Sequence, residues 1–449
     1  MCCSCDVDLL ALEANGLQTC RINSHGFDAD LAGLVFLGYN IFKIHFILSI
    51  PVLVASFASS SSAPRRVHEL PGLLSLLVMK LRGIHRSEMG VIKVVVRTLT
   101  VLFWFGTCMA ETFSANFVFG DSLVEVGNNN YITSLSKANY VPNGIDFGMP
   151  TGRYTNGRTI VDILGQEVGF KDYTPPFLSP TTVGPLVLRG VNYASGGGGI
   201  LNHTGKIFVG RINLDAQLDN FAKTRQDIIS GIGFPAAQNL LNRALFSVTI
   251  GSNDFINNYL TPIVSTIEQK LVTPEAFVGT MIARFRSQLT RLYDMGARKI
   301  VIPNVGPIGC IPYQRDITPS AGDDCVPLPN HLAQLFNSQL KALLQDLTIS
   351  LQGSTFVFAD VYRIVADIIQ NYQSYGFDHA DSACCYVTGV HGGLVPCGPT
   401  SKVCPDRSKY VFWDPYHPSD ATNAIIAKRL MDGGIEDISP LNIRALLES

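Results

Sequence analysis

A serine in the first half of the chain has the neighbours expected of a nucleophile. Ser122 follows the tripeptide Phe119-Gly120-Asp121, at the end of an apolar run over 115–120 that predicts a buried strand. Open α/β sheets bind their ligands at the carboxyl ends of strands. A serine hydroxyl is a weak nucleophile at neutral pH and needs a general base. Taken alone, Ser122 is equally well explained as a helix cap.

The segment 413–418, WDPYHP, supplies a base and a carboxylate. His417 carries an imidazole whose ordinary pKa lies near neutrality, and imidazole is the usual base for a nucleophilic serine. Asp414 precedes it by three residues, close enough to reach the far ring nitrogen, fix the tautomer and stabilise the imidazolium. An isolated D-x-x-H pair is also explained by a surface aspartate and a hydrogen-bonded histidine without a catalytic role.

Two more polar segments follow predicted strands and have groups that stabilise an oxyanion. Asn253 lies in the segment 250–254, IGSND, and a glycine run at 196–199 follows the segment 192–195, NYAS. Acyl transfer builds negative charge on the carbonyl oxygen, which an asparagine amide and backbone N–H groups stabilise. The alternative of phosphate binding is disfavoured, because no G-x-G-x-x-G motif or Walker lysine accompanies the glycines.

Taken together, these segments resemble the four signature blocks of the GDSL-type (SGNH hydrolase) esterases and lipases, in the plant subgroup. The blocks are FVFGDSLVEVGNNN from Phe117, NYASGGGGIL from Asn192, IGSNDFINNY from Ile250 and FWDPYHPSDATN from Phe412. They occur in the family's order, with PTGRYTNGRT from Pro150 and NVGPIGCIP from Asn304 as further familiar stretches. One departure is Glu125, which stands where the family usually has aspartate.

The resemblance implies a three-layer α/β/α SGNH-hydrolase fold with a mostly parallel sheet of about five strands. It also implies a secreted serine hydrolase that cleaves carboxylic esters through an acyl-enzyme, with no cofactor or metal. By position, the implied residues are the nucleophile Ser122, the general base His417, its orienting partner Asp414, and the oxyanion donors Asn253, the Ser122 amide and either Gly197 or Gly199. Nucleophiles of this family do not lie on a G-x-S-x-G elbow, and the sequence has none.

Two other functions remain open on the same fold. An acyltransferase would pass the acyl group to a second alcohol instead of water. A weakly catalytic extracellular binding protein is the other, since a fold does not assure activity, although every catalytic residue type is present. Acyl lipids, polyesters, acetylated sugars and small esters all remain possible substrates. No obligate protein partner is predicted.

Strands and helices alternate after residue 110, which is typical of α/β proteins. Strands are predicted at 115–120, 187–194, 244–250, 299–303 and 355–359. Their apolar runs are continuous, as expected of parallel strands buried on both faces. Helices are predicted at 274–295, 328–351 and 418–431 from apolar spacings of three and four. The segments 143–157, 175–185 and 378–408, rich in Gly, Pro and Ser, are predicted loops.

The composition is that of a globular protein, with 47% hydrophobic residues and a formal net charge of -2, which leaves no basic face for nucleic acid. An apolar segment within 89–110 resembles a secretory signal peptide, with small residues before a cleavage point at 110. We therefore expect translation to start at Met89, residues 1–88 to be a non-native extension or unstructured, and a single catalytic domain at 111–449. The alternatives are that the segment within 89–110 is a membrane anchor or a buried helix, or that the apolar stretch 31–58 is itself a signal or anchor.

Six of the 11 cysteines lie after residue 110, namely Cys310, Cys325, Cys384, Cys385, Cys397 and Cys404. An even number in a secreted protein predicts up to three disulfides, whose pairing the sequence does not decide. Zinc binding by Cys397 and Cys404 near His391 is the alternative, but the spacing matches no two-by-two zinc cluster. The segment 202–204, NHT, is a glycosylation sequon.

Overall fold

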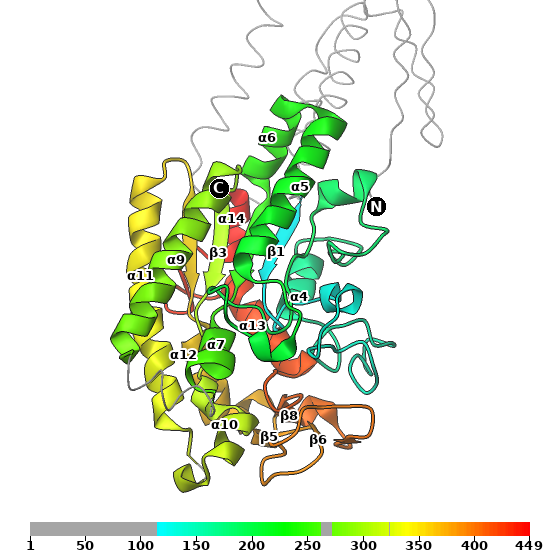
Figure 1. Cartoon of the computed structure of the whole chain (residues 1–449), viewed down its shortest axis with the longest axis vertical. Helices are drawn as coiled ribbons and strands as arrows, with labels where there is room; N and C mark the ends of the chain where they lie inside the picture. Colours follow the sequence, from blue (N-terminus) through cyan, green and yellow to red (C-terminus); the bar gives the residue numbers. More distant parts are fainter. Residues whose placement is uncertain (1–114, 262–271, 323) are drawn as a thin grey trace, which may run out of the picture. The chain divides into compact units, whose positions relative to one another are not determined.

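The computed structural model of this chain describes residues 115–261, 272–322 and 324–449 (Figure 1). The predicted signal peptide at 89–110 and the predicted extension at 1–88 lie outside the described residues, as does the apolar stretch 31–58. Within the described part of the chain, no helix is long and apolar enough to cross a membrane.

The central sheet has five strands in the order β1-β2-β3-β4-β9. They are β1 (Asn116–Gly120), β2 (Leu245–Thr249), β3 (Lys299–Pro303), β4 (Thr355–Ala359) and β9 (Ile438–Ser439). The first four are parallel, and β9 pairs antiparallel with β4. Every residue of β1 and β2 is buried, which explains why their sequences are continuous apolar runs. The predicted mostly parallel five-stranded α/β fold is confirmed.

Helices cover both faces of this sheet (Figure 1). On one face lie α5 (Leu214–Ile232), α9 (Pro274–Asp294) and α11 (Pro327–Ser350), and on the other α4 (Ile160–Glu167) and α13 (Asp420–Asp432). Further α-helices are α6 (Phe234–Arg243), α7 (Ser252–Asp254), α10 (Pro312–Ile317), α12 (Val361–Gln370) and α14 (Ile443–Glu448). The ring of Phe221 on α5 packs against Phe117 and Phe119 of β1, with ring centroids 5.3 and 5.7 Å apart.

Local capping decides where the predicted helices begin. The Thr273 hydroxyl accepts from the amide of Ala276, and Pro274 fits the first helical turn, so α9 begins as predicted. The helix predicted from residue 418 begins two residues later instead. Ser419 is its N-cap, with its hydroxyl accepting from the Thr422 amide at 3.2 Å, so Pro418 lies before the helix.

The strand predicted at 187–194 is wrong. Gly184–Arg189 forms a 3-10 helix instead, and Gly190 then turns the chain at a φ of 109°. Only a short stretch beside β1 remains extended, where the amide of Tyr193 donates to the Val118 carbonyl at 2.7 Å. The fifth strand of the sheet is the two-residue β9, which the sequence analysis did not find.

The predicted loop at 378–408 is a disulfide-linked region with short strands. These are β5 (His379–Ala383), β6 (Cys385–Tyr386), β7 (Lys402–Val403) and, just after it, β8 (Tyr410–Phe412). The six cysteines pair as Cys310–Cys325, Cys384–Cys404 and Cys385–Cys397. The predicted disulfides are therefore present, and the two cysteines considered for zinc each belong to a disulfide.

Candidate active site

A continuous series of hydrogen bonds joins Ser122 to two side chains from the other end of the sequence. The hydroxyl of Ser122 lies 2.7 Å from Nε2 of His417. Nδ1 of the same ring lies 2.8 Å from Oδ2 and 2.9 Å from Oδ1 of Asp414. His417 and Asp414 are buried, whereas Ser122 is partly exposed to the cavity that all three line. This is the arrangement in which an imidazole removes a hydroxyl proton while a carboxylate holds its other nitrogen.

The end of β1 holds Ser122 in place. The amide of Asp121 donates to the Thr249 carbonyl at 3.0 Å, which joins the turn after β1 to the end of β2. A Cβ at Gly120 would overlap that same carbonyl oxygen, so the close approach of the two strands requires glycine. The side chain of Gln217 on α5 bonds both the amide and the carbonyl of Gly120, at 2.9 and 2.7 Å.

Asp414 also shapes the loop that carries His417. Its Oδ1 accepts from the backbone amides of Tyr416 and His417, each at 2.8 Å. The Trp413 amide donates to the His417 carbonyl at 2.8 Å, which closes the loop. The indole of Trp413 is fully buried against the disulfides and donates to Asn143 at 3.0 Å. The loop is thus held in one conformation before any substrate binds.

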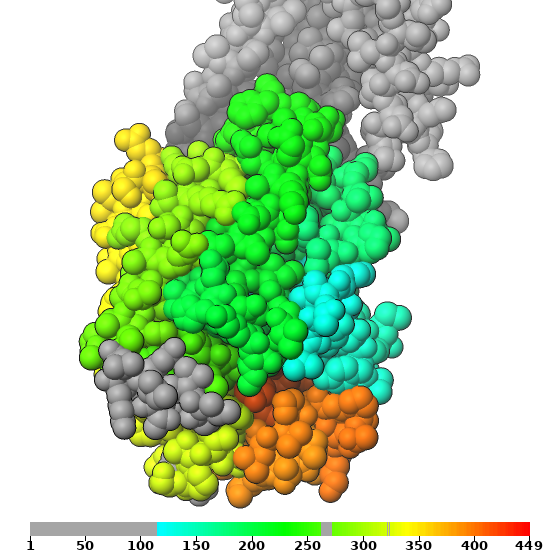
Figure 2. Space-filling view, viewed as in Figure 1, coloured from blue at the N-terminus to red at the C-terminus, as the bar shows by residue number. Residues whose placement is uncertain are grey.

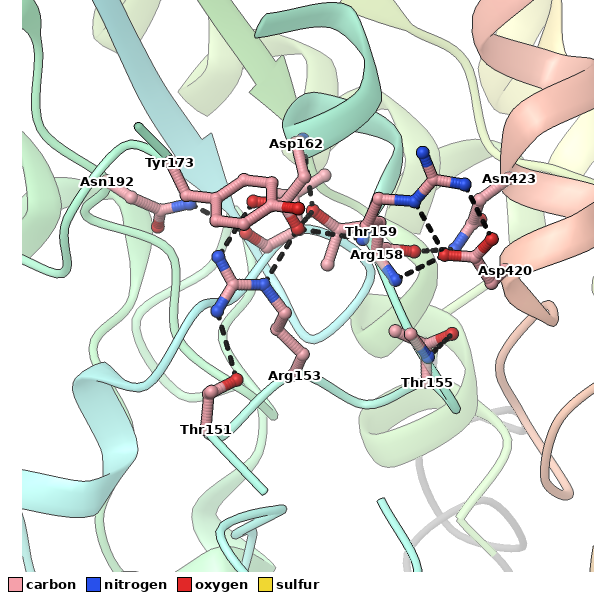
Figure 3. A network of polar contacts seen from close by, with 12 residues as sticks. Thr151, Arg153, Thr155, Arg158, Thr159, Asp162, Tyr173, Asn192, Asp420 and Asn423 are labelled. Atoms are coloured by element: carbon pink, nitrogen blue, oxygen red, sulfur yellow. Dashed lines mark hydrogen bonds and ion pairs between the residues drawn. The ribbon is translucent and has the colours of Figure 1, made fainter. Parts of the chain in front are cut away.

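A polar network behind this loop connects α13 to α4 (Figure 3). Asp420, at the start of α13, accepts from the guanidinium of Arg158 at 2.9 and 3.0 Å, and Asn423 donates to the Arg158 carbonyl. Arg153 forms a buried bidentate pair with Asp162 at 2.7 Å. These arginines belong to the PTGRYTNGRT stretch, for which the sequence analysis proposed no role. The structure shows that Arg158 holds the start of α13, whereas Arg153 holds Asp162 in α4.

Asn253 has a defined amide orientation beside Ser122. Its Nδ2 donates to the carbonyl of Gly198 at 3.0 Å, and its Oδ1 accepts from Asn257 at 2.5 Å. One hydrogen of Nδ2 is therefore used within the protein and the second is available to a ligand. Asn253 lines the same cavity as Ser122 and His417.

The two candidate glycines have different surroundings. The amide of Gly199 donates to Oδ1 of Asn213 at 2.9 Å, so it is already satisfied. Gly197 lines the cavity with Ser122, and no hydrogen bond from its amide is found among the described residues. Its φ of 80° lies in the left-handed region, which favours glycine. Of the two glycines, Gly197 therefore has the amide that is free to bind a ligand in the cavity.

A buried aspartate, Asp254, connects the loops that carry these two donors. Its carboxylate accepts from the amides of Ile200 and Leu201 at 2.9 and 3.0 Å, and from the hydroxyl of Thr204 at 2.6 Å. Burial raises the pKa of Asp254 to about 6, although these hydrogen bonds stabilise the ionised carboxylate and act to lower the pKa. This role was not predicted from the sequence, although Asp254 directly follows Asn253 in the segment 250–254.

Two more carboxyl groups lie buried beside Ser122. Glu125 accepts from the amide of Asn129 at 2.6 Å and from the amide of Gly196, and burial raises its pKa to about 8. Burial likewise raises the pKa of Asp121 to about 7, although its Oδ1 accepts from the Leu123 amide. Glu125 thus holds Gly196, the residue before Gly197. The family usually has aspartate at this position, and the glutamate keeps a carboxyl group there that accepts backbone amides.

These raised pKa values predict that stability falls as the pH rises. Glu125 shifts from an ordinary 4.5 to about 8, so between these values the folded state binds more protons than the unfolded state. The free energy of unfolding then decreases with rising pH. Glu125→Gln cannot titrate and is expected to reduce this slope, measured by urea unfolding at about pH 5 and about pH 9. An exposed control, Glu167→Gln, keeps the wild-type slope, and an equal slope in Glu125→Gln would refute the explanation.

The candidate catalytic side chains open into a cavity of about 410 Å³. Ser122, His417, Asn253 and Gly197 line it together with a majority of apolar residues. Figure 2 shows the surface recessed between the green segment and the orange disulfide-linked region, and both contribute lining residues. Such a mostly apolar pocket with a few convergent polar groups is typical of a small-molecule site.

Comparison with known proteins supports an ester-hydrolase site. Residues 117–430 match the family model described as GDSL-like Lipase/Acylhydrolase. GDSL esterase/lipase At4g16230 of Arabidopsis thaliana is 64% identical over 349 residues, which cover 78% of this chain and 95% of the relative. GDSL esterase/lipase At2g23540 of the same plant is 53% identical over 337 residues, covering 74% of this chain and 87% of the relative.

Proposed function

Because the chain belongs to the GDSL-like lipase/acylhydrolase family and is a serine carboxylic ester hydrolase, we propose that it cleaves acyl esters through an acyl-enzyme formed on Ser122. The observation that carries the proposal is the pair of hydrogen bonds made by His417, 2.7 Å to the Ser122 hydroxyl and 2.8 Å to Asp414. No other residue described here offers Ser122 a base at this distance.

In the proposed reaction, the Ser122 hydroxyl attacks the ester carbonyl as Nε2 of His417 takes its proton. The oxyanion accepts hydrogen bonds from the amides of Ser122 and Gly197 and from Nδ2 of Asn253. His417 then returns the proton to the leaving alcohol. A water molecule repeats the attack on the acyl-enzyme, and Asp414 stabilises the imidazolium in both steps.

Covalent labelling tests the acyl-enzyme route. A fluorophosphonate probe is expected to phosphonylate Ser122, with mass spectrometry locating the adduct on the peptide that contains it. His417→Ala should label far more slowly, because the hydroxyl then lacks its base. Rapid labelling at another serine, with Ser122 unmodified, would refute the assignment.

Acyl transfer to an alcohol uses the same acyl-enzyme and differs only in the acceptor. Turnover of p-nitrophenyl esters in the presence and absence of glycerol separates the two, because a transferase yields an acylated glycerol and a hydrolase yields the free acid. We propose hydrolysis, with an acyl ester of a lipid, polyester or acetylated sugar as substrate. A protein that labels at Ser122 but turns over no ester would instead be a weakly catalytic binder.

Secretion to the extracellular space or cell wall is also part of the proposal. Three disulfides suit an oxidising compartment, and the segment 89–110 has the composition of a signal peptide. The side chain of Asn202 in the 202–204 sequon is exposed, as an attached glycan requires.

A further inference from the structure

The cavity at Ser122 extends far beyond the catalytic residues, along one face of the sheet. Leu245, Ser247 and Thr249 of β2 all line it. Alternate residues of a strand point to the same face, so these three form one row that begins beside the active site. From Thr249 to Leu245 the row covers four residues, or about 13 Å. Val301 of β3 extends this wall sideways.

Helix α13 forms the opposite wall. Thr422, Ile426 and Leu430 line the cavity at intervals of four residues, which places them on one face of the helix. This row starts five residues after His417 and runs for eight residues, or about 12 Å. Ile443 of α14 also lines the cavity. Helix α14 lies at the inner end, where Lys299 pairs with Leu245 and donates to the Leu447 carbonyl. The two walls therefore have nearly the same length.

The chemistry of these walls suits a hydrocarbon. Below the active site most wall residues are aliphatic, with hydroxyls only on Ser247, Thr249 and Thr422 among those named. A charged group or a sugar placed there would lose most of its hydrogen bonds to water without replacing them. Protein interiors are normally filled to high density, so an apolar space that opens onto a nucleophile is unusual for a core. Its position next to Ser122 places an ester carbonyl at one end and the rest of an acyl group inside.

We propose that the space between β2 and α13, lined by Leu245, Ser247, Ile426, Leu430 and Ile443, is an acyl channel that holds the substrate's acyl chain with its methyl end toward α14. The proposal rests on the proposed function, because it needs the ester carbonyl at Ser122. It adds that the substrate is a medium- or long-chain acyl ester, and that acetylated sugars are poor substrates.

Ser247 is the residue that keeps this channel open. It is only 5% exposed, and its hydroxyl has no hydrogen-bond partner among the described residues. It lies midway along the β2 row, where a larger side chain would enter the space between β2 and α13. A small residue here therefore sets the depth to which an acyl chain enters.

The test compares p-nitrophenyl acetate and p-nitrophenyl dodecanoate, each below its micelle-forming concentration. In the wild-type protein kcat/KM should rise from acetate to dodecanoate. Ser247→Leu is expected to lower the dodecanoate-to-acetate ratio of kcat/KM by at least about tenfold. Ser247→Ala keeps the space and therefore the ratio, and Ser338→Leu, the same change on the exposed face of α11, leaves both rates unchanged.

The far end of the channel gives an independent measurement. Ile443→Ala removes the inner boundary and should shift the preferred chain length from dodecanoate toward palmitate. A wild-type kcat/KM that is highest for acetate would overturn the channel, as would equal losses on acetate and dodecanoate in a folded Ser247→Leu variant. Absence of any ester turnover together with absence of fluorophosphonate labelling would instead overturn the proposed function itself.

Discussion

Ser122→Ala is expected to lower kcat for p-nitrophenyl esters by about 10⁶-fold, as loss of the nucleophile does in subtilisin. The reason is that the variant keeps the oxyanion donors and the cavity but has no atom that forms the acyl-enzyme. His417→Ala should cost about as much, because without Nε2, 2.7 Å away, the hydroxyl keeps its proton. Steady-state kinetics with the purified protein provide the measurement.

A double variant of Ser122 and His417 tests whether the two side chains act together. If Ser122 and His417 act as a unit, Ser122→Ala combined with His417→Ala loses little more than either change alone. Ser338→Ala on the exposed face of α11 serves as the control and keeps full activity. Losses that multiply in the double variant, or a Ser122→Ala protein that retains a tenth of the wild-type rate, would show that the two side chains act separately.

Asp414→Asn is expected to lower kcat by about 10⁴-fold, although the loop keeps its conformation. Oδ1 still accepts the amides of Tyr416 and His417, so the new amide nitrogen takes the place of Oδ2. There it donates to Nδ1 of His417, 2.8 Å away, and forces the ring proton onto Nε2. A protonated Nε2 cannot accept the proton of Ser122.

The pH dependence of kcat/KM checks this explanation. If the Asp414→Asn variant is slow because His417 has the wrong tautomer, its circular dichroism and thermal stability should change little. Its kcat/KM should be low throughout the neutral pH range. Asp294→Asn, an exposed aspartate at the end of α9, is the matched control with unchanged kinetics. If kcat of Asp414→Asn falls less than tenfold, Asp414 only stabilises the conformation of the loop and does not orient the imidazole of His417.

Strand and helix positions were predictable wherever a single local pattern dominated. The predicted strands 299–303 and 355–359 match β3 and β4 residue for residue, because each is a polar residue, Lys299 or Thr355, followed by four apolar ones. The run at 187–194 looked similar but follows Gly184-Pro185, and these residues start a 3-10 helix. The two-residue β9 has too little sequence to carry a pattern.

Residue types and their order determined the reaction class and the candidate triad. Ser122 after a buried strand and the D-x-x-H segment at 414–417 can be recognised in the sequence, because each is a short local motif. The contact between Ser122 and His417 spans 295 residues and depends on the fold. Only the tertiary structure distinguishes the amide of Gly199 from that of Gly197, since Asn213, which accepts the Gly199 amide, lies 14 residues further on. A hydrogen-bond partner brought in by folding leaves no trace in local sequence.

The same reason covers the other features that only the folded chain reveals. The pairing of six cysteines depends on which loops meet, and Asp254 becomes a link between two loops only when β2 brings them together. The acyl channel is a space between β2 and α13, elements more than 150 residues apart. The volume of the channel depends on the distance between β2 and α13. The sequence pattern of each element predicts its apolar face but not that distance.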